Sequence, residues 1–156
     1  MSRSIFVPSR GISLTFQSGL AAGVFNPADN TTYFVGEQIG APQTTTGLRR
    51  IYVPAGVSAV TEVSGFAFHA NAGVTAEAVT VKLRKNGDSG TDTTIGTFTH
   101  NDNAVVGGAY ISPFRFTDLT FGIDGGDYIE LAIATPNPGW ATNPTTVIYV
   151  GNVFVS

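Results

Sequence analysis

The chain has two histidines, the residue type that can take the most chemical roles at neutral pH. Imidazole serves both as a general base and as a metal ligand. His69 ends an aromatic, strand-like run, and His100 precedes Asn101, Asp102 and Asn103. A metal site built on His100 and Asp102 lacks a third protein ligand nearby in the sequence, and zinc generally takes three or four. We therefore interpret both histidines as strand ends that run into polar turns. We expect no metal and no cofactor.

The acidic residues suggest turns more than catalysis. The segment from Asn86 to Asp92 is rich in oxygen ligands and glycine, but it lacks the spacing and the terminal glutamate of a helix–loop–helix calcium loop. We interpret it as a solvated hairpin turn, with a loose calcium site as the alternative. Asp124 and Asp127 flank two glycines, which favours turn geometry over the paired carboxylates of a hydrolase.

Enzyme motifs are absent from the sequence. It has no Gly-x-Ser-x-Gly nucleophile motif and no phosphate-binding glycine loop with its lysine. The expectation is therefore a protein that is not an enzyme. A hydrolase of cell-surface polymers is a distant alternative, which a cleft with two carboxylates would support.

Trp140 differs from the other aromatic residues, because it lies in a loop between Pro138 and Pro144. It would act either as a ligand platform that stacks on sugars or as an anchor that plugs one end of the fold. The anchor is the favoured interpretation. The other aromatic residues are expected mostly in the core, as is usual: Phe66, Phe68, Phe98, Tyr110, Phe114, Phe116, Phe121, Tyr128, Tyr149 and Phe154.

Two segments alternate most cleanly between apolar and polar residues, the pattern of a strand with one buried face. They run over residues 78–85 and 128–133. Asn86-Gly87 follows the first and predicts a tight hairpin turn. The residues expected to be buried are Val81, Leu83, Ile129, Leu131 and Ile133. The residues expected to be at least partly exposed are Lys82, Arg84 and Glu130.

Further strand-like runs complete an all-β pattern of about eight antiparallel strands. Residues 59–70 carry Val60, Phe66 and Phe68 on one parity, but Glu62 and Ser64 interrupt that face and predict either a bulge or a semi-exposed end. Pro113 interrupts residues 109–121, which favours an edge position or a strand that switches sheets. Frequent Gly, Pro and Asn between the runs indicate a β-sandwich or roll. The remaining runs cover residues 31–35, 48–53, 93–99 and 147–155.

The last run, residues 147–155, is apolar on both parities. A strand of this kind must be covered on both faces. In a chain of 156 residues the second cover is expected to be another copy of the chain. Tyr149 and Phe154 are the residues that we assign to this interface between copies.

Residues 1–30 are expected to form an arm outside the roll, which would span residues 31–156. The arm has one short alternating run followed by Gly, Asn and Pro. Two interpretations stay open: the arm docks on a neighbouring protein, or it packs along its own roll. The apolar residues available for partner binding are Ile5, Phe6, Leu14 and Phe16.

Several motifs resemble known jelly rolls. The run Gly126–Leu131, followed by a last strand with Gly151 and Phe154, resembles the end of the tumour necrosis factor and complement-type globular domains. The run Val79–Gly87 resembles their middle strand, and the segment Trp140–Thr146 is similar to one in small bacteriophage virion modules. The resemblance covers roughly residues 31–156 and implies a jelly-roll β-sandwich that assembles as a homotrimer in a virion.

Composition limits the partners. Charged residues make up only 12% of the chain, the formal net charge is −3, and no basic block exists, so no nucleic-acid partner is expected. No apolar run approaches the roughly 18 residues of a membrane span, so no membrane is expected. With the resemblance, these features imply a non-enzymatic bacteriophage structural protein. It would be assembled in the host cytoplasm and lie at the particle surface as a capsid decoration or head-fibre protein bound to the major capsid protein. A tail-fibre tip that binds host glycans is the alternative.

Overall fold

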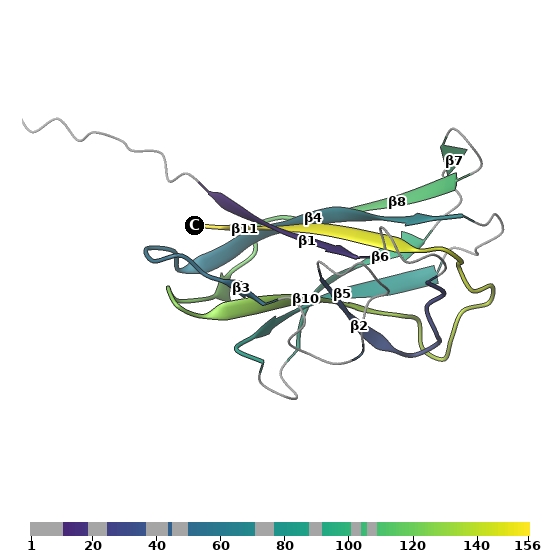
Figure 1. The fold of residues 1–156 in the computed structure, drawn as a ribbon, viewed down its shortest axis with the longest axis horizontal. Helices are drawn as coiled ribbons and strands as arrows, with labels where there is room; N and C mark the ends of the chain where they lie inside the picture. Colours follow the sequence, from purple (N-terminus) through teal and green to yellow (C-terminus); the bar gives the residue numbers. More distant parts are fainter. Residues whose placement is uncertain are drawn as a thin grey trace, which may run out of the picture.

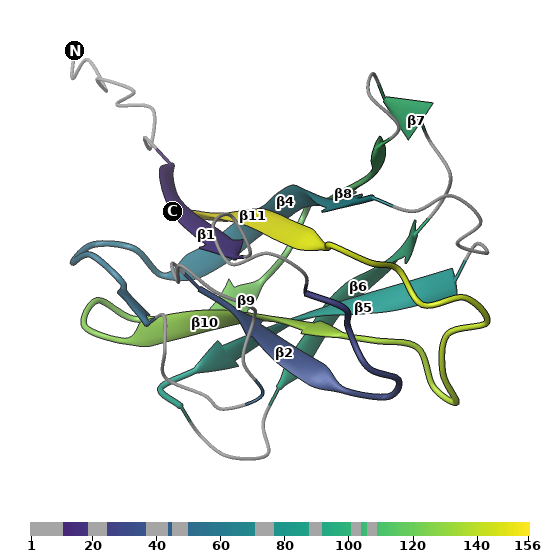
Figure 2. The same ribbon diagram turned by 45° about the vertical axis from the view of Figure 1, so that its right-hand side comes forward.

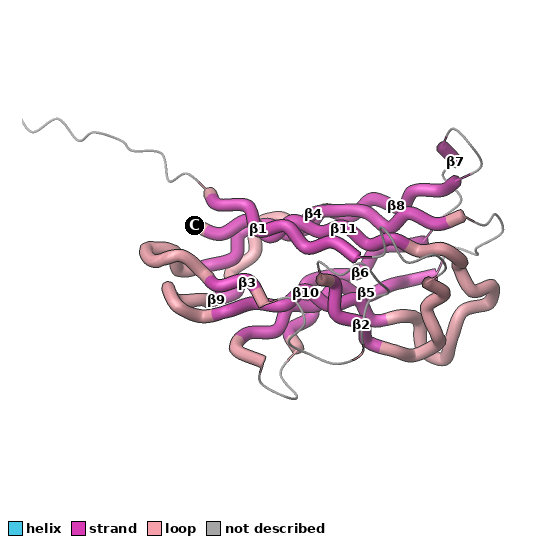
Figure 3. The backbone as a smooth tube through the Cα atoms, viewed as in Figure 1, coloured by secondary structure: helices cyan, strands magenta, loops and turns pink. Residues whose placement is uncertain are grey.

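The structure is a computed structural model that describes residues 11–18, 25–36, 44, 50–70, 77–87, 92–100, 104–105 and 109–156. Within these residues the chain forms strands and loops, with no helix (Figure 3). The strands make two sheets that lie face to face (Figures 1 and 2). This architecture confirms the prediction of an all-β sandwich.

The strands of each sheet pair antiparallel throughout. The six-stranded sheet has the order β1 (Ile12–Ser18), β11 (Ile148–Val155), β4 (Ala59–His69), β8 (Ala109–Phe116) and β7 (Ala104–Val105), with β9 (Phe121–Gly122) also on β4. The five-stranded sheet has the order β2 (Thr32–Val35), β10 (Tyr128–Ala134), β5 (Glu77–Lys85) and β6 (Thr93–His100), with β3 (Ile51–Tyr52) also on β10.

The connections between the longer strands give the jelly-roll topology. Successive longer strands alternate between the two sheets, except for the β5–β6 hairpin. Among the described residues, eight strands have four or more residues, and β3, β7 and β9 have two each. The prediction of about eight strands in a jelly-roll sandwich is therefore confirmed.

The core lies between the sheets, and the alternation of β5 and β10 decides which of their side chains enter it. Leu83 and Leu131 are direct cross-strand partners, and both point inward. All five residues predicted to be buried expose 1% or less of their surface, so the predicted register of these two strands is right.

Two charged residues predicted to be partly exposed are buried instead. Arg84 and Glu130 are partners on the outward face of the β5–β10 pair and expose 9% and 1%. Buried charges are stable only when they are paired. The Arg84 Nε donates to Asp92 over 2.6 Å, and Arg50 Nε lies 3.8 Å from Glu130 Oε1. The prediction that Arg84 and Glu130 lie on the outward face is right, and the prediction that they are at least partly exposed is wrong.

A bulge in β4 changes which face its aromatic residues occupy. The register between β4 and β11 shifts where Val155 pairs with Val60 and Phe154 pairs with Glu62. The predicted bulge is therefore present, at Thr61. Because the extra residue reverses the alternation, Phe66 and Phe68 do not share the face of Val60, as the sequence suggested. They face outward and are half-buried, whereas the inward residues of β4 are Val60, Val63, Ala67 and His69.

The turn that follows β5 matches its sequence signal. Asn86 and Gly87 have φ angles of 55° and 65°, so both adopt the left-handed conformation of a turn. The connection is longer than a two-residue hairpin, because β6 begins only at Thr93. The Asn86 side chain also donates to Asp127 Oδ1 over 2.7 Å and accepts from the Tyr128 N–H over 3.0 Å. These bonds join the turn to the start of β10. Residues 88–91 of the alternative calcium loop lie outside the described residues.

The predicted arm is in part a strand of the sandwich. β1 pairs with β11 along its whole length, from Ile12 opposite Val155 to Ser18 opposite Tyr149. Its inward residues Leu14 and Phe16 expose 9% and 0% and belong to the core cluster. Burial of such side chains stabilises the roll, so Leu14 and Phe16 are core residues and not partner-binding residues. Ile5 and Phe6 lie outside the described residues.

Candidate functional site

The outward face of the six-stranded sheet is the surface best suited to binding, and β11 shows why. Its side chains alternate between buried positions that face the core and half-buried positions that face outward. Tyr149 is an inward residue and exposes 1%, so its assignment to an interface between copies is corrected: it fills the core of its own chain. Phe154 belongs to the outward set with Ile148 and Val150.

Apolar side chains continue across the neighbouring strands of this face. Register places Val150, Phe66 and Pro113 in one cross-strand row. A second row holds Ile148, Phe68 and Ile111. Strands β11, β4 and β8 lie side by side in Figure 1, so the two rows form one continuous strip. We call these six residues the apolar band; Pro113 is exposed and the other five are half-buried.

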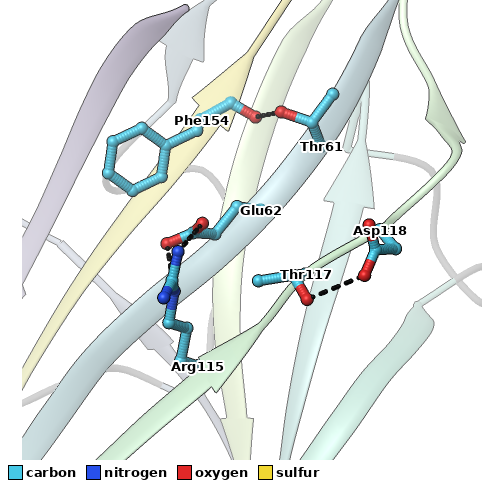
Figure 4. A network of polar contacts seen from close by, with 6 residues as sticks. All are labelled: Thr61, Glu62, Arg115, Thr117, Asp118 and Phe154. Atoms are coloured by element: carbon cyan, nitrogen blue, oxygen red, sulfur yellow. Dashed lines mark hydrogen bonds and ion pairs between the residues drawn. The ribbon is translucent and has the colours of Figure 1, made fainter.

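Polar groups border the apolar band. Arg115 of β8 donates from Nε and Nη2 to the two carboxylate oxygens of Glu62 over 3.0 and 2.9 Å (Figure 4). The hydrogen bond from Arg115 holds the pKa of the Glu62 carboxyl below its usual value. In the register, Glu62 pairs with Phe154, and the next row joins Asn152 to Thr15 by a 2.9 Å hydrogen bond. An apolar centre with a polar rim is the usual anatomy of a protein interface.

The described residues were compared with the requirements of a metal site and of a membrane-spanning helix. Within them, no group of three or more His, Asp or Glu side chains is arranged to hold a metal ion. In the same part of the chain, no helix has the length and apolarity needed to cross a bilayer. Asp124 and Asp127 form a turn, as expected, because the Asp124 N–H donates to Asp127 Oδ2 over 2.8 Å.

Sequence reasoning missed a contact between the two histidines. The rings of His69 and His100 stack with their centroids 5.1 Å apart and their planes at 27°. His69 ends β4 and His100 ends β6, so the stack joins the two sheets. Both residues are fully buried. For His100 the signal was present in the sequence, since it continues the inward parity of Phe98.

Aromatic rings enclose the histidine pair. Tyr110 of β8 stacks on His69 at 5.4 Å. Trp140 meets His100 edge to face at 5.2 Å, and Tyr149 does so at 6.1 Å. Trp140 exposes only 7%, and its backbone N–H donates to Asp29 Oδ1 over 2.9 Å. Burial of the ring fits the anchor interpretation of Trp140 and leaves no open face for a ligand platform.

Burial sets the protonation of this cluster. Removal from water, and then the nearby His69, lowers the pKa of His100 to about 3. Removal from water also raises the pKa of Tyr149 above its usual value. The buried polar atoms of this cluster that find no hydrogen-bond partner among the described residues include His100 Nδ1 and Nε2, Trp140 Nε1 and Tyr149 Oη. The cluster therefore holds His100 as a neutral imidazole at neutral pH.

Comparison with known proteins gives a fold likeness of low similarity. No family model matches the sequence, and no curated protein matches it. Among solved structures, the Eiger TNF of S. frugiperda is similar over 94% of this chain and 93% of its own. The identity is 10% and the TM-score is 0.43.

Proposed function

We propose that this chain is a non-enzymatic structural protein that assembles with copies of itself through the apolar band. The apolar band is the observation that carries the proposal. In a monomer, two rows of apolar side chains across three strands would remain against water, although each large one gains roughly 1.5–3 kcal/mol when fully buried. A second copy of the same weakly charged chain is the partner that we assign to it.

A homotrimer is the assembly that we propose, because the sequence motifs resemble those of trimeric jelly rolls. Arg115 lies in the row next to the apolar band and pairs with Glu62 (Figure 4), so this ion pair would form part of its polar rim. Phe154, opposite Glu62, would add an apolar contact beyond that rim. Rim pairs contribute little affinity, but they select the orientation of the partner. The six residues of the apolar band would form the centre of each contact.

Light scattering of the purified protein at micromolar concentration should give about three times the chain mass of 16.3 kDa. Phe66→Lys should give a single chain mass, because it places a charge at the centre of the apolar band. Thr97→Lys is the matched control, since Thr97 is exposed on the other sheet, and it should leave the trimer intact. A monomeric parent protein, or a trimer that survives Phe66→Lys, would contradict the proposed interface.

We further propose that the trimer decorates a bacteriophage capsid and stabilises the shell. The support for this role is the resemblance of the Trp140–Thr146 segment and its flanking strands to virion modules. Attachment would use residues 1–10, which precede β1 and include the apolar Ile5 and Phe6. This segment replaces the longer arm of residues 1–30, because β1 belongs to the roll.

Deletion of residues 1–10 should leave a folded trimer with an unchanged melting temperature that no longer co-sediments with undecorated capsids. The reason is that the deletion keeps β1 and both sheets intact. Full-length protein is the positive control, and Thr97→Lys controls for changes of surface charge. Normal capsid binding by the truncated trimer would move the attachment surface to the roll. Absence of binding by the full-length protein would reject the virion role.

The alternative function, a tail-fibre tip that binds glycans, has less support. Sugar recognition commonly needs an open aromatic face, and Trp140 is buried against His100. We therefore keep capsid decoration as the proposed role.

A further inference from the structure

Both histidines of the chain meet in one place, although β4 and β6 belong to different sheets. Their rings stack at 5.1 Å and are fully buried. An imidazolium ion needs water or a counter-charge, and two like charges in contact repel each other. The closed arrangement therefore accepts neutral imidazoles and resists protonated ones.

We propose that the His69–His100 stack is an acid-sensitive latch, and that acidification opens this end of the sandwich and releases the segment 135–147 that carries Trp140. The proposal goes beyond the proposed structural role and does not rest on it. It concerns one chain, so it applies to a monomer as well as to a trimer.

The tyrosine side chains around the stack give a proton on His100 no compensating charge. Tyr110 from β8 and Tyr149 from β11 carry no charge in the acid range. Tyr33 of β2, which acts on Tyr149, is likewise neutral there. These tyrosines can neither offset nor mimic the charge of an imidazolium.

Asp29 and Glu77 are acidic residues at this end of the sandwich, and Asp29 Oδ1 accepts from the Trp140 N–H. Glu77 is the cross-strand partner of His100 in the β5–β6 ladder. Its Oε1 accepts a hydrogen bond from the backbone N–H of Ala141, so this carboxylate is already engaged by the segment 135–147. Burial and His69, in that order, account for the lowered pKa of His100, with no contribution that raises it.

The direction of the pH effect follows from the two states of His100. In an open or unfolded chain an imidazole takes up its proton near pH 6.5. In the closed protein the pKa of His100 is about 3. Between these values the open state binds more protons, so the stability is complete above about pH 6.5 and is lost as the pH falls. Each pH unit in this window lowers the ratio of closed to open protein by up to about tenfold, because His100 stays neutral in the closed state.

Hydrogen bonds hold both ends of the segment 135–147. Thr135 N–H bonds to the Thr31 carbonyl at one end, and Val147 N–H bonds to the Phe25 carbonyl at the other, both over 2.9 Å. In the middle, Trp140 packs its ring on His100, its N–H binds Asp29, and the Ala141 N–H binds Glu77. Protonation of His100 therefore acts first on the ring packing of Trp140, and release of the segment also requires these backbone bonds to break.

Trp140 is the single tryptophan of the chain, so its fluorescence reports on the latch. The experiment is a titration of the full-length protein from pH 7.5 to 4, followed by tryptophan emission and by far-UV circular dichroism. We expect the emission to shift to longer wavelength between about pH 6 and 4, before the β-sheet signal falls. Emission that stays constant until the β-sheet signal is lost would overturn the proposal.

Two variants test whether the change in Trp140 emission comes from protonation of a histidine or of a carboxylate. His100→Phe keeps an aromatic ring beside Trp140 but cannot be protonated, so its emission change should move to lower pH and become less steep. Asp118→Asn removes an exposed carboxylate from the loop after β8, outside the apolar band and the histidine cluster, and its emission change should match that of the unmodified protein. An emission change in His100→Phe identical to that of the unmodified protein would also reject the latch.

Nuclear magnetic resonance of the unmodified protein supplies a measurement that needs no substitution. The His100 side chain should show no protonation in the closed protein near pH 6, and should become protonated only with the Trp140 change. If His100 titrates near pH 6.5 while the Trp140 emission stays constant, the stack tolerates charge and is no latch.

Discussion

Phe16→Ala should lower the free energy of unfolding by about 3–5 kcal/mol, the usual cost of removing a buried phenylalanine ring. Phe16 is fully buried in the core cluster, and its strand β1 pairs with β11 along its whole length. For a chain of this size, each kcal/mol corresponds to a decrease of about 2–4 °C in the melting temperature. Chemical denaturation of both proteins at the same concentration would measure the loss, because the contribution of assembly to the stability is then held constant.

Thr15→Ala is the matched control for Phe16→Ala. Thr15 is the neighbouring residue on the same strand, is exposed, and bonds through Oγ1 to Asn152. Its replacement should change the stability by no more than about 0.5 kcal/mol, as is usual at surfaces. Equal and small effects of both substitutions would mean that β1 does not belong to the roll, and would restore the arm of residues 1–30.

Gly65→Ala should be similarly damaging, with a loss of about 3 kcal/mol or more, at the upper end of the usual cost of overpacking. A Cβ atom at this position would lie 2.7 Å from Cζ of Phe114 and 2.9 Å from the Cα of Gly151. It would approach the carbonyl oxygen of Val150 still more closely. Two of these three atoms belong to the backbone of β11, which cannot move away without breaking its ladder with β4.

Gly122→Ala provides the comparison for Gly65→Ala within the same sheet. A Cβ atom at Gly122 meets nothing within 4 Å. The substitution should leave the protein equally stable or stabilise it by up to about 1 kcal/mol, because alanine restricts the unfolded chain. Thermal unfolding of the two variants side by side tests this. Similar melting temperatures would show that β4 and β11 are not as closely packed as described.

Local alternation was enough to predict much of the sandwich. In β5 and β10 the pattern has a period of two without interruption, so each side chain is assigned to a face by its neighbours alone. The Asn86-Gly87 turn was equally predictable, because few residues other than Asn and Gly adopt two successive left-handed conformations. The double apolar character of β11 also came from the sequence, since both of its parities carry large side chains.

Features that depend on contacts between distant residues were predicted less well. An irregularity in this strand was anticipated, but the position of the extra residue, Thr61, depends on how β4 pairs with β11. Without that position, Phe66 and Phe68 were assigned to the face of Val60, which is wrong. Burial of Glu130 depends on its position beside Arg84 and Arg50. Burial of Tyr149 depends on the five-stranded sheet, which packs against the inward face of β11. None of these partners lies nearby in the sequence.

The sequence by itself determined the fold class, the main strands and the faces of β5 and β10, because period-two alternation and turn chemistry act between neighbouring residues. Only the tertiary structure decided that β1 joins the roll, that the apolar band is continuous, and that His69 and His100 stack. The histidines are 31 residues apart on strands of different sheets, and no local pattern encodes a contact between sheets. That contact exists only once two sheets, each specified locally, pack against each other and exclude water from between them.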